Sequence, residues 1–210
     1  MYNLPYYKEQ DPALVMQFVR EHPFAFISGC DKEQQPVVTQ VPVFIDERDG
    51  KIFLSGHMMK NTDHHKAFQQ NNNALAVFTG PNTYVSASWY TNKHQGSTWN
   101  YQSVHARGKL SFQEGQALLD ILKRTTTHFE NDPHSGANFD DLPKEYVEQM
   151  SKAIVAFEIE VEKLEHVFKL SQNRDEQSYD NIVVKLKEKG GDAATIGQLM
   201  EDRKSKVFPS

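Results

Sequence analysis

The order of apolar and polar residues along much of the chain follows the two-residue period of β-strands. Apolar, β-branched runs separated by turn-forming residues predict strands at residues 24–28, 37–45, 51–55, 74–78, 83–90, 99–112 and 154–161, the last continuing towards residue 170. Turns are expected at residues 46–50 and 80–82. Because these strands do not alternate regularly with crossover helices, the pattern is typical of an antiparallel barrel or an α+β fold.

Elsewhere the pattern changes to the longer period of amphipathic helices. Asp11 and Pro12 are typical of a helix N-cap and first helical position, and Asn61 or Thr62 is expected to cap a second helix that ends at residue 71. Further helices are expected at residues 116–129, 144–152, 180–189 and 192–202. A polar segment at residues 131–141, which contains Pro133, predicts a loop between two of them.

The expected strand that begins at Trp99 mixes aromatic and amide side chains. Trp99 and Tyr101 fall on one face of the strand, and Asn100 falls on the other. A half-buried strand ordinarily separates apolar from polar residues more cleanly. The pattern indicates a surface that holds a flat ligand with polar edges. The alternative is a structural strand whose aromatic residues belong to the core or to an interface.

Two short polar segments could hold an anion. Residues 55–62 are expected to end a strand, turn at Gly56 and cap a helix, so the free N–H groups of the helix start and the Lys60 ammonium would suit one phosphate. The alternative is ordinary capping beside a surface lysine. Residues 169–174 form a dense set of hydrogen-bond donors after the last strand, and the alternative there is a polar loop that begins a helix.

Composition and charge exclude several classes of protein. The 210 residues are 38% apolar, and 23 basic residues against 28 acidic ones give a net charge of −5, which disfavours a long nucleic-acid footprint. Cys30 is the single cysteine, so neither an intrachain disulfide nor a cysteine-cluster metal site is expected. His57, His64 and His65 lack metal-ligand spacing, and no metal site is expected. No signal peptide or membrane span is expected, which favours a cytoplasmic location.

Several segments, taken in this order, resemble the PaiB family of FMN-binding split-barrel proteins, whose members are often labelled negative transcriptional regulators. The segments that carry the resemblance are His22-Pro23-Phe24-Ala25, Thr39-Gln40-Val41-Pro42, Gly56-His57 with Asn61, Phe78-Thr79-Gly80-Pro81, Ser88-Trp89-Tyr90, Thr98-Trp99-Asn100-Tyr101, Val104-His105-Ala106-Arg107-Gly108 and Lys169-Leu170-Ser171-Gln172-Asn173. The resemblance spans about residues 1–185.

The resemblance implies a mainly β, α+β fold: a six-stranded antiparallel split β-barrel with peripheral helices, related to pyridoxamine-phosphate oxidases and flavin reductases. We expect this FMN-binding domain at residues 1–178 and a short helical extension, packed on the barrel, at residues 179–210. The family also implies a homodimer with flavin at the subunit interface.

The site residues follow from the resemblance, position by position. Four residues would line the isoalloxazine ring: Thr39, Gln40, Val41 and Pro42. The phosphate would be held by Lys60 and Asn61, with Thr62 at the helix start. Trp99, Asn100 and Tyr101 would flank the ring or its tail, and Lys169, Gln172 and Asn173 would complete a site near the dimer seam. The chain departs from the family where it has Met59-Lys60, because members often carry arginine there, and lysine keeps the charge but loses the bidentate fork.

Three functions are compatible with this reading. The first is a flavin reductase or NAD(P)H-dependent oxidoreductase that uses FMN, for which no catalytic side chain is identified. The second is a transcriptional regulator that acts indirectly or as a flavin sensor. The third is a haem-binding split-barrel protein with His57 or His105 as ligand. Direct DNA binding is not expected, since the helices at 180–189 and 192–202 imitate a helix-turn-helix but offer few base-reading side chains.

Overall fold

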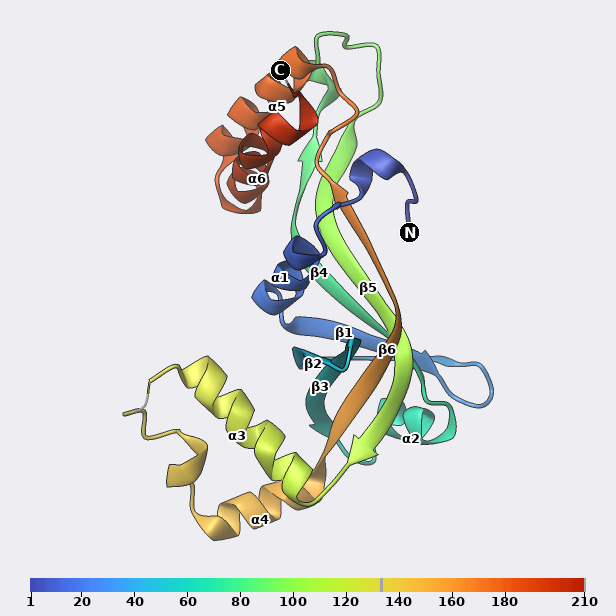
Figure 1. The fold of residues 1–210 in the computed structure, drawn as a ribbon, viewed down its shortest axis with the longest axis vertical. Helices are drawn as coiled ribbons and strands as arrows, with labels where there is room; N and C mark the ends of the chain where they lie inside the picture. The colour runs from blue at the N-terminus through green and yellow to red at the C-terminus, as the bar shows by residue number, and fades with distance from the viewer. Residues whose placement is uncertain (133, 210) are drawn as a thin grey trace. The chain divides into compact units, whose positions relative to one another are not determined.

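Six strands close into a barrel in the part of the chain that the computed structural model describes, residues 1–132 and 134–209. Their order around the barrel is β1-β2-β3-β6-β5-β4 (Figure 1). The strands are β1 (Phe24–Cys30), β2 (Pro36–Arg48), β3 (Lys51–Met59), β4 (Asn73–Val85), β5 (Thr98–Gln113) and β6 (Ile154–Lys169). The registers that join β1 to β2 and β4, and β3 to β2 and β6, are antiparallel, which confirms the expected split-barrel fold class.

The turn expected at Gly56 is wrong, because β3 continues through it to Met59. A Cβ atom at position 56 would lie 2.7 Å from the carbonyl oxygen of Pro42 and 2.8 Å from the ring of Phe157. The glycine is therefore needed for close packing of the barrel wall, where the neighbouring backbone and a buried ring leave no room for a side chain.

The turn expected at residues 80–82 is also wrong, since β4 is one continuous strand from Asn73 to Val85. The ladder between β1 and β4 joins Phe26, Ile27 and Ser28 to residues 75–77. Pro81 lies beyond this paired stretch, where its missing N–H costs no hydrogen bond to β1. The strand expected as far as residue 90 ends at Val85 and gives way to a short 3-10 helix, η2 (Ala87–Trp89).

Six α-helices lie at or near the expected positions in the described chain. They are α1 (Pro12–Glu21), α2 (Asp63–Gln70), α3 (Gln116–Glu130), α4 (Lys144–Ala153), α5 (Glu176–Lys189) and α6 (Gly191–Val207). Helix α5 begins earlier than expected because the Asp175 carboxylate accepts the N–H of Ser178 at 2.9 Å and caps the helix there. Within the expected loop, residues 139–141 form a 3-10 helix, and Pro133 lies outside the described residues.

The chain contacts divide the protein into two compact units. Unit 1 comprises Met1–Phe18, Thr79–Val104 and Glu165–Ser210, and unit 2 comprises Val19–Phe78 and His105–Leu164. The division expected at residue 178 stays a prediction. In unit 2, helix α3 covers the outer face of the sheet through an apolar cluster of Phe44, Leu118, Ile121, Leu122, Ile154 and Ala156.

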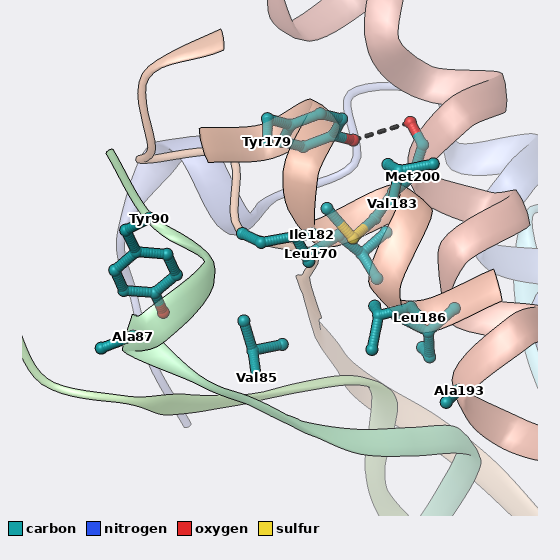
Figure 2. Close-up of a cluster of buried hydrophobic side chains, with 11 residues drawn as sticks. Val85, Ala87, Tyr90, Leu170, Tyr179, Ile182, Val183, Leu186, Ala193 and Met200 are labelled. Atoms are coloured by element: carbon teal, nitrogen blue, oxygen red, sulfur yellow. Dashed lines mark hydrogen bonds between the residues drawn. The ribbon is translucent and has the colours of Figure 1, made fainter. Parts of the chain in front are cut away.

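The core of unit 1 is built around the antiparallel pair of helices α5 and α6 (Figure 2). Tyr179 of α5 is fully buried, and its hydroxyl donates to the carbonyl of Met200 on α6 at 2.7 Å. Val85, Ala87 and Tyr90 pack against the same cluster from the end of β4 and the segment after it. Burying these side chains supplies the apolar area that holds the C-terminal helices in unit 1.

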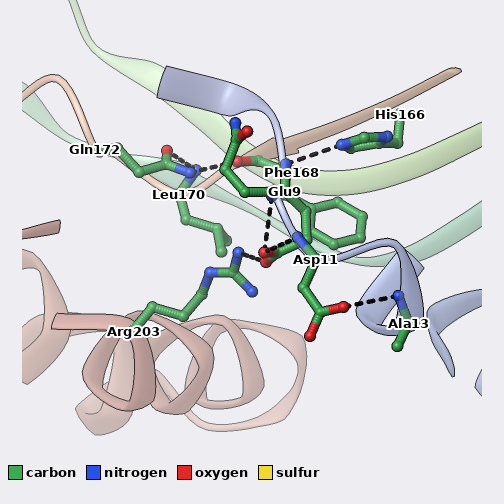
Figure 3. A network of polar contacts seen from close by, with 9 residues as sticks. Glu9, Asp11, Ala13, His166, Phe168, Leu170, Gln172 and Arg203 are labelled. Carbon is green, nitrogen blue, oxygen red and sulfur yellow. Dashed lines mark hydrogen bonds and ion pairs between the residues drawn. The ribbon is translucent and has the colours of Figure 1, made fainter. Parts of the chain in front are cut away.

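A buried ion pair joins the N-terminal segment of unit 1 to helix α6 (Figure 3). The Glu9 carboxylate accepts from the Arg203 guanidinium and from the N–H groups of Gln10 and Asp11. The N–H of Glu9 donates to Nε2 of His166 at 2.8 Å. Burial opposes ionisation of Glu9, but the Asp11 N–H and the Arg203 guanidinium outweigh it and hold the pKa of Glu9 below its usual range.

Candidate functional site

The four residues expected to line the flavin ring lie on β2 in unit 2, opposite β1. Gln40 pairs with Phe26, and Pro42 pairs with Phe24, so these side chains share the outer face of the sheet. Ala25 and Ile27 point to the buried face, and their register partners Val41 and Thr39 lie on that same face. The outer face therefore combines an exposed amide and a proline with two exposed phenylalanines.

Three apolar side chains on this face form what we call the β1–β2 patch: Phe24, Phe26 and Val38. Their exposed fractions are 56%, 40% and 57%. Val38 pairs with Ser28, so the three side chains lie along neighbouring strands of one sheet face. Single apolar residues are common on surfaces but clusters of them are not, so this patch is a candidate interaction surface.

The phosphate residues expected from the sequence lie together at the junction of β3 and α2. The N–H of Lys60 donates to the carbonyl of Ala153 at 2.8 Å, which fixes the backbone at the end of β3. Asn61 adopts the left-handed conformation with φ of 63°, and the Thr62 hydroxyl caps α2 by accepting the N–H of His65 at 3.3 Å. The turn thus directs Lys60, Asn61 and Thr62 into one small region.

The start of α2 is less electropositive than the sequence suggests. The His64 N–H donates to the Asp63 carboxylate at 2.7 Å, so two N–H groups of the first turn already have partners. The Lys60 ammonium donates to the Glu114 carboxylate at 2.5 Å. Glu114 was missed in the sequence, because it lies 54 positions away at the end of another strand and only the fold brings it to Lys60.

Lys60 is one of the residues that line a groove of about 440 Å³ in unit 2. Leu118 and Leu119 of α3 and Val147 of α4 supply its apolar lining. The polar lining residues are Lys60, Glu114, Glu148, Ser151 and Lys152. A groove with apolar residues and a half-buried ammonium in its lining suits an organic ligand that carries an anionic group.

In unit 1 the structure brings together two segments that the sequence singled out separately. The Lys169 ammonium donates to the Thr98 hydroxyl at 2.5 Å and lies 5.5 Å from the ring centroid of Tyr2 and 5.9 Å from that of Tyr7. Burial and the nearby Arg174 charge lower the pKa of Lys169. Tyr2 and Tyr7 were not expected in this site, and their position against Lys169 is a cation–π arrangement.

The other candidate residues of unit 1 differ in what they offer a ligand. Trp99 is 54% exposed and meets the Tyr84 ring edge-on at 6.1 Å between centroids. Asn100 is fully buried, and its amide bonds the Ser171 hydroxyl and the Met200 sulfur.

Tyr101 is half-buried, which raises the pKa of its hydroxyl. The Gln172 amide bonds the backbone of Phe168 and Leu170 (Figure 3), and Asn173 is exposed. Trp99 and Asn173 are thus exposed and Tyr101 is partly exposed to a ligand. Asn100 instead bonds neighbouring side chains, and Gln172 bonds the backbone.

No group of three or more histidine, cysteine, aspartate or glutamate side chains with metal-binding geometry occurs within residues 1–132 and 134–209. His57 lies on β3, where burial lowers the pKa of its imidazole. None of the helices in the described part of the chain is long and apolar enough to cross a membrane.

Comparison with known proteins identifies the family of the chain and several solved structures that share its fold. Residues 1–163 match the family described as "Putative FMN-binding domain". The chain is 31% identical over 207 residues to "Protease synthase and sporulation protein PAI 2" of Bacillus subtilis, covering 98% of this chain and 99% of that protein.

Solved structures show the same fold at low sequence identity. The flavocytochrome Anf3 from Azotobacter vinelandii superposes with a TM-score of 0.57 at 15% identity, over 85% of this chain and 77% of that one. The FAD and heme binding protein from Mycobacterium smegmatis gives a TM-score of 0.54 at 15% identity, over 77% and 72% of the two chains. At these identities the likeness concerns the fold alone.

Proposed function

Since the chain belongs to the PaiB family of FMN-binding split-barrel proteins, we propose that it is an FMN-dependent flavin reductase or NAD(P)H-dependent oxidoreductase. The observation that carries the proposal is the β3–α2 junction, where a half-buried lysine ammonium faces an open groove. This junction lies within the part of the chain that matches the FMN-binding family.

The residues present fit the phosphate and ring of FMN. Lys60 supplies a cation that suits a phosphate. The Thr62 hydroxyl donates to the carbonyl of Met59 at 3.1 Å and the N–H of Asn61 to Nδ1 of His65 at 3.2 Å, so the ammonium is the main donor that this junction offers. On β2, we propose that Thr39, Gln40, Val41 and Pro42 line the ring, with Gln40 offering an exposed amide to a polar edge. Trp99, Asn100, Tyr101, Lys169, Gln172 and Asn173 stay proposed flavin residues, of which Trp99 offers an exposed indole.

Bound FMN would supply the hydride chemistry, which explains why the chain needs no obvious acid–base pair. The protein's own part is to hold the phosphate and to orient the ring. A covered slot also excludes water, which protects a reduced ring from side reactions. We therefore assign the candidate residues to binding and orientation, and none of them to proton transfer.

Titration of the apoprotein with FMN and riboflavin tests this proposal, followed by NADH and NADPH oxidation assays with added flavin. We expect tighter binding of FMN, a flavin absorption spectrum, and pyridine-nucleotide oxidation that depends on bound FMN. FMN binding without any such oxidation would favour a flavin sensor. A haem spectrum without flavin binding would contradict the proposal and favour the haem-binding alternative.

Any regulatory role is proposed to be indirect. The buried side of α6, which includes Ile196 and Met200, packs in the core of unit 1. On its outer side the Gln198 amide donates to the carboxylates of Glu201 and Asp202 at 3.1 and 2.8 Å. The residue best suited to read a base thus lies among acids, which repel a phosphate backbone.

We also propose a homodimer with flavin at the subunit interface, and the β1–β2 patch supports it. Phe26→Asp places a charge in the middle of this patch, where a partner subunit would have to desolvate it. We expect the dimer dissociation constant to rise at least about tenfold, and FMN affinity to fall with it. Sedimentation velocity at micromolar protein concentration, with and without FMN, measures both effects.

Val184→Asp is the matched control for Phe26→Asp. Val184 is 54% exposed on α5, outside the β1–β2 patch, and the same charge there should leave the dimer intact. A wild-type protein that is a stable monomer and still binds FMN would refute the homodimer proposal. An unchanged dimer in Phe26→Asp would remove this patch from the interface.

A further inference from the structure

The carboxylate that pairs with Lys60 sits at a junction between two elements. Glu114 follows the end of β5 at Gln113 and precedes Gly115, which has φ of +63° and stands at the N-cap of α3. The Glu114 side chain is 67% exposed, whereas that of Lys60 is 24% exposed. The hydrogen bond from Lys60 and its charge lower the pKa of Glu114.

The other nearby acid already has partners of its own. Asp63 accepts the backbone N–H of His64 at 2.7 Å and lies 3.1 Å from the imidazole Nδ1 of the same residue. Its carboxylate serves the first turn of α2, while the Glu114 carboxylate is bonded to the Lys60 ammonium. Glu114 therefore occupies the hydrogen-bonding position that an incoming phosphate would need.

We propose that Glu114 is a built-in counter-ion that competes with the FMN phosphate for Lys60 and so sets the affinity for phosphorylated flavin; this inference rests on the proposed phosphate role of Lys60. A phosphate and a carboxylate on the same ammonium repel each other, which disfavours binding of both at once. Glu114 is the partner with room to move away, because its side chain is 67% exposed whereas that of Lys60 is 24% exposed.

The site would thus have an empty form and a phosphate-bound form. With Glu114 in place, Lys60 is neutralised and held in one orientation, which lowers the attraction for stray anions. With phosphate bound, the Glu114 carboxylate is released to water. Phosphate-containing flavin must therefore displace a bound group, whereas riboflavin, which lacks the phosphate, leaves the Lys60–Glu114 pair intact.

Glu114→Gln removes the competing charge and keeps the shape of the side chain. We expect FMN to bind roughly fivefold more tightly, because a partly exposed ion pair of this kind no longer has to be broken. Riboflavin affinity should change by less than about twofold. Flavin fluorescence quenching measures both affinities. Inorganic phosphate added as a competitor should displace FMN from the wild type at a lower concentration than phosphate needs to bind Lys60→Met.

Two further variants make the result decisive. Glu188→Gln removes the carboxylate of the exposed Lys185–Glu188 ion pair on α5, which does not line the groove, and it should leave FMN affinity unchanged. In the double variant Lys60→Met/Glu114→Gln, the increase in FMN affinity caused by Glu114→Gln should disappear. If Glu114→Gln leaves FMN binding unchanged or weakens it while Lys60→Met weakens FMN binding, the counter-ion role of Glu114 is overturned and the phosphate role of Lys60 stands. An unchanged FMN affinity in Lys60→Met would overturn the phosphate role of Lys60 and this inference together.

Discussion

Lys60→Glu is expected to weaken FMN binding by about a hundredfold while riboflavin affinity changes by less than about twofold. The substitution removes a charge-assisted hydrogen bond to the phosphate, for which about 1.5–3 kcal/mol is typical. It also places a second carboxylate beside Glu114, so the phosphate would meet two like charges there. Riboflavin avoids both penalties, because it carries no phosphate.

Lys185→Glu is the matched control for this experiment, since Lys185 is an exposed, ion-paired lysine on α5 that does not line the groove. It makes the same change of charge outside the β3–α2 junction. Titrations of each variant with FMN and riboflavin, followed by fluorescence quenching, give the ratio of the two affinities. Equal losses of FMN affinity and riboflavin affinity in Lys60→Glu would contradict the proposed phosphate role of Lys60.

Gly108→Ala is expected to prevent the chain from folding stably. Gly108 lies on β5, and a Cβ atom there would stand 2.0 Å from the carbonyl oxygen of Glu160 and 3.0 Å from Cγ2 of Ile159. The obstacle at 2.0 Å is backbone of the neighbouring strand β6, so no side-chain rotation relieves it. We expect a loss above about 4 kcal/mol, a large part of the stability of an ordinary domain.

Gly96→Ala provides the comparison, because an added Cβ at position 96 would meet no atom within 4 Å. Urea unfolding followed by circular dichroism should show a normal transition for Gly96→Ala and little or no folded protein for Gly108→Ala. A Gly108→Ala protein with the unfolding midpoint of wild type would show that β5 and β6 can separate at this point without cost.

The elements of this fold could be read from the sequence where local chemistry decides them. Asp11 and Pro12 mark the start of α1, and Thr62 caps α2 as expected. The turn predicted at Gly56 was wrong, because the role of this glycine depends on Pro42 and Phe157, which approach it only in the folded barrel. A glycine that permits a turn and a glycine that permits close contact look the same in a sequence.

The candidate site was harder still to predict, because its contacts join residues that are far apart in the sequence. Lys60 was recognisable because it stands beside a capping threonine, which is a local signal. Its partner Glu114 was not, since the ion pair depends on how β5 and α3 meet in three dimensions. In unit 1, the contact between Lys169 and Thr98 also joins distant segments, although each segment was conspicuous by itself.

The ion pair between Glu9 and Arg203 has a consequence for how the protein is made. Its two residues are separated by 194 positions, so the N-terminal segment leaves the ribosome long before its partner on α6 exists. At a synthesis rate of about 5–20 residues per second, Arg203 is added to the chain roughly 10 to 40 seconds after Glu9. A chain that stops before α6 would lack the Arg203 partner of the Glu9 carboxylate, whereas the N–H of Glu9 could still donate to His166.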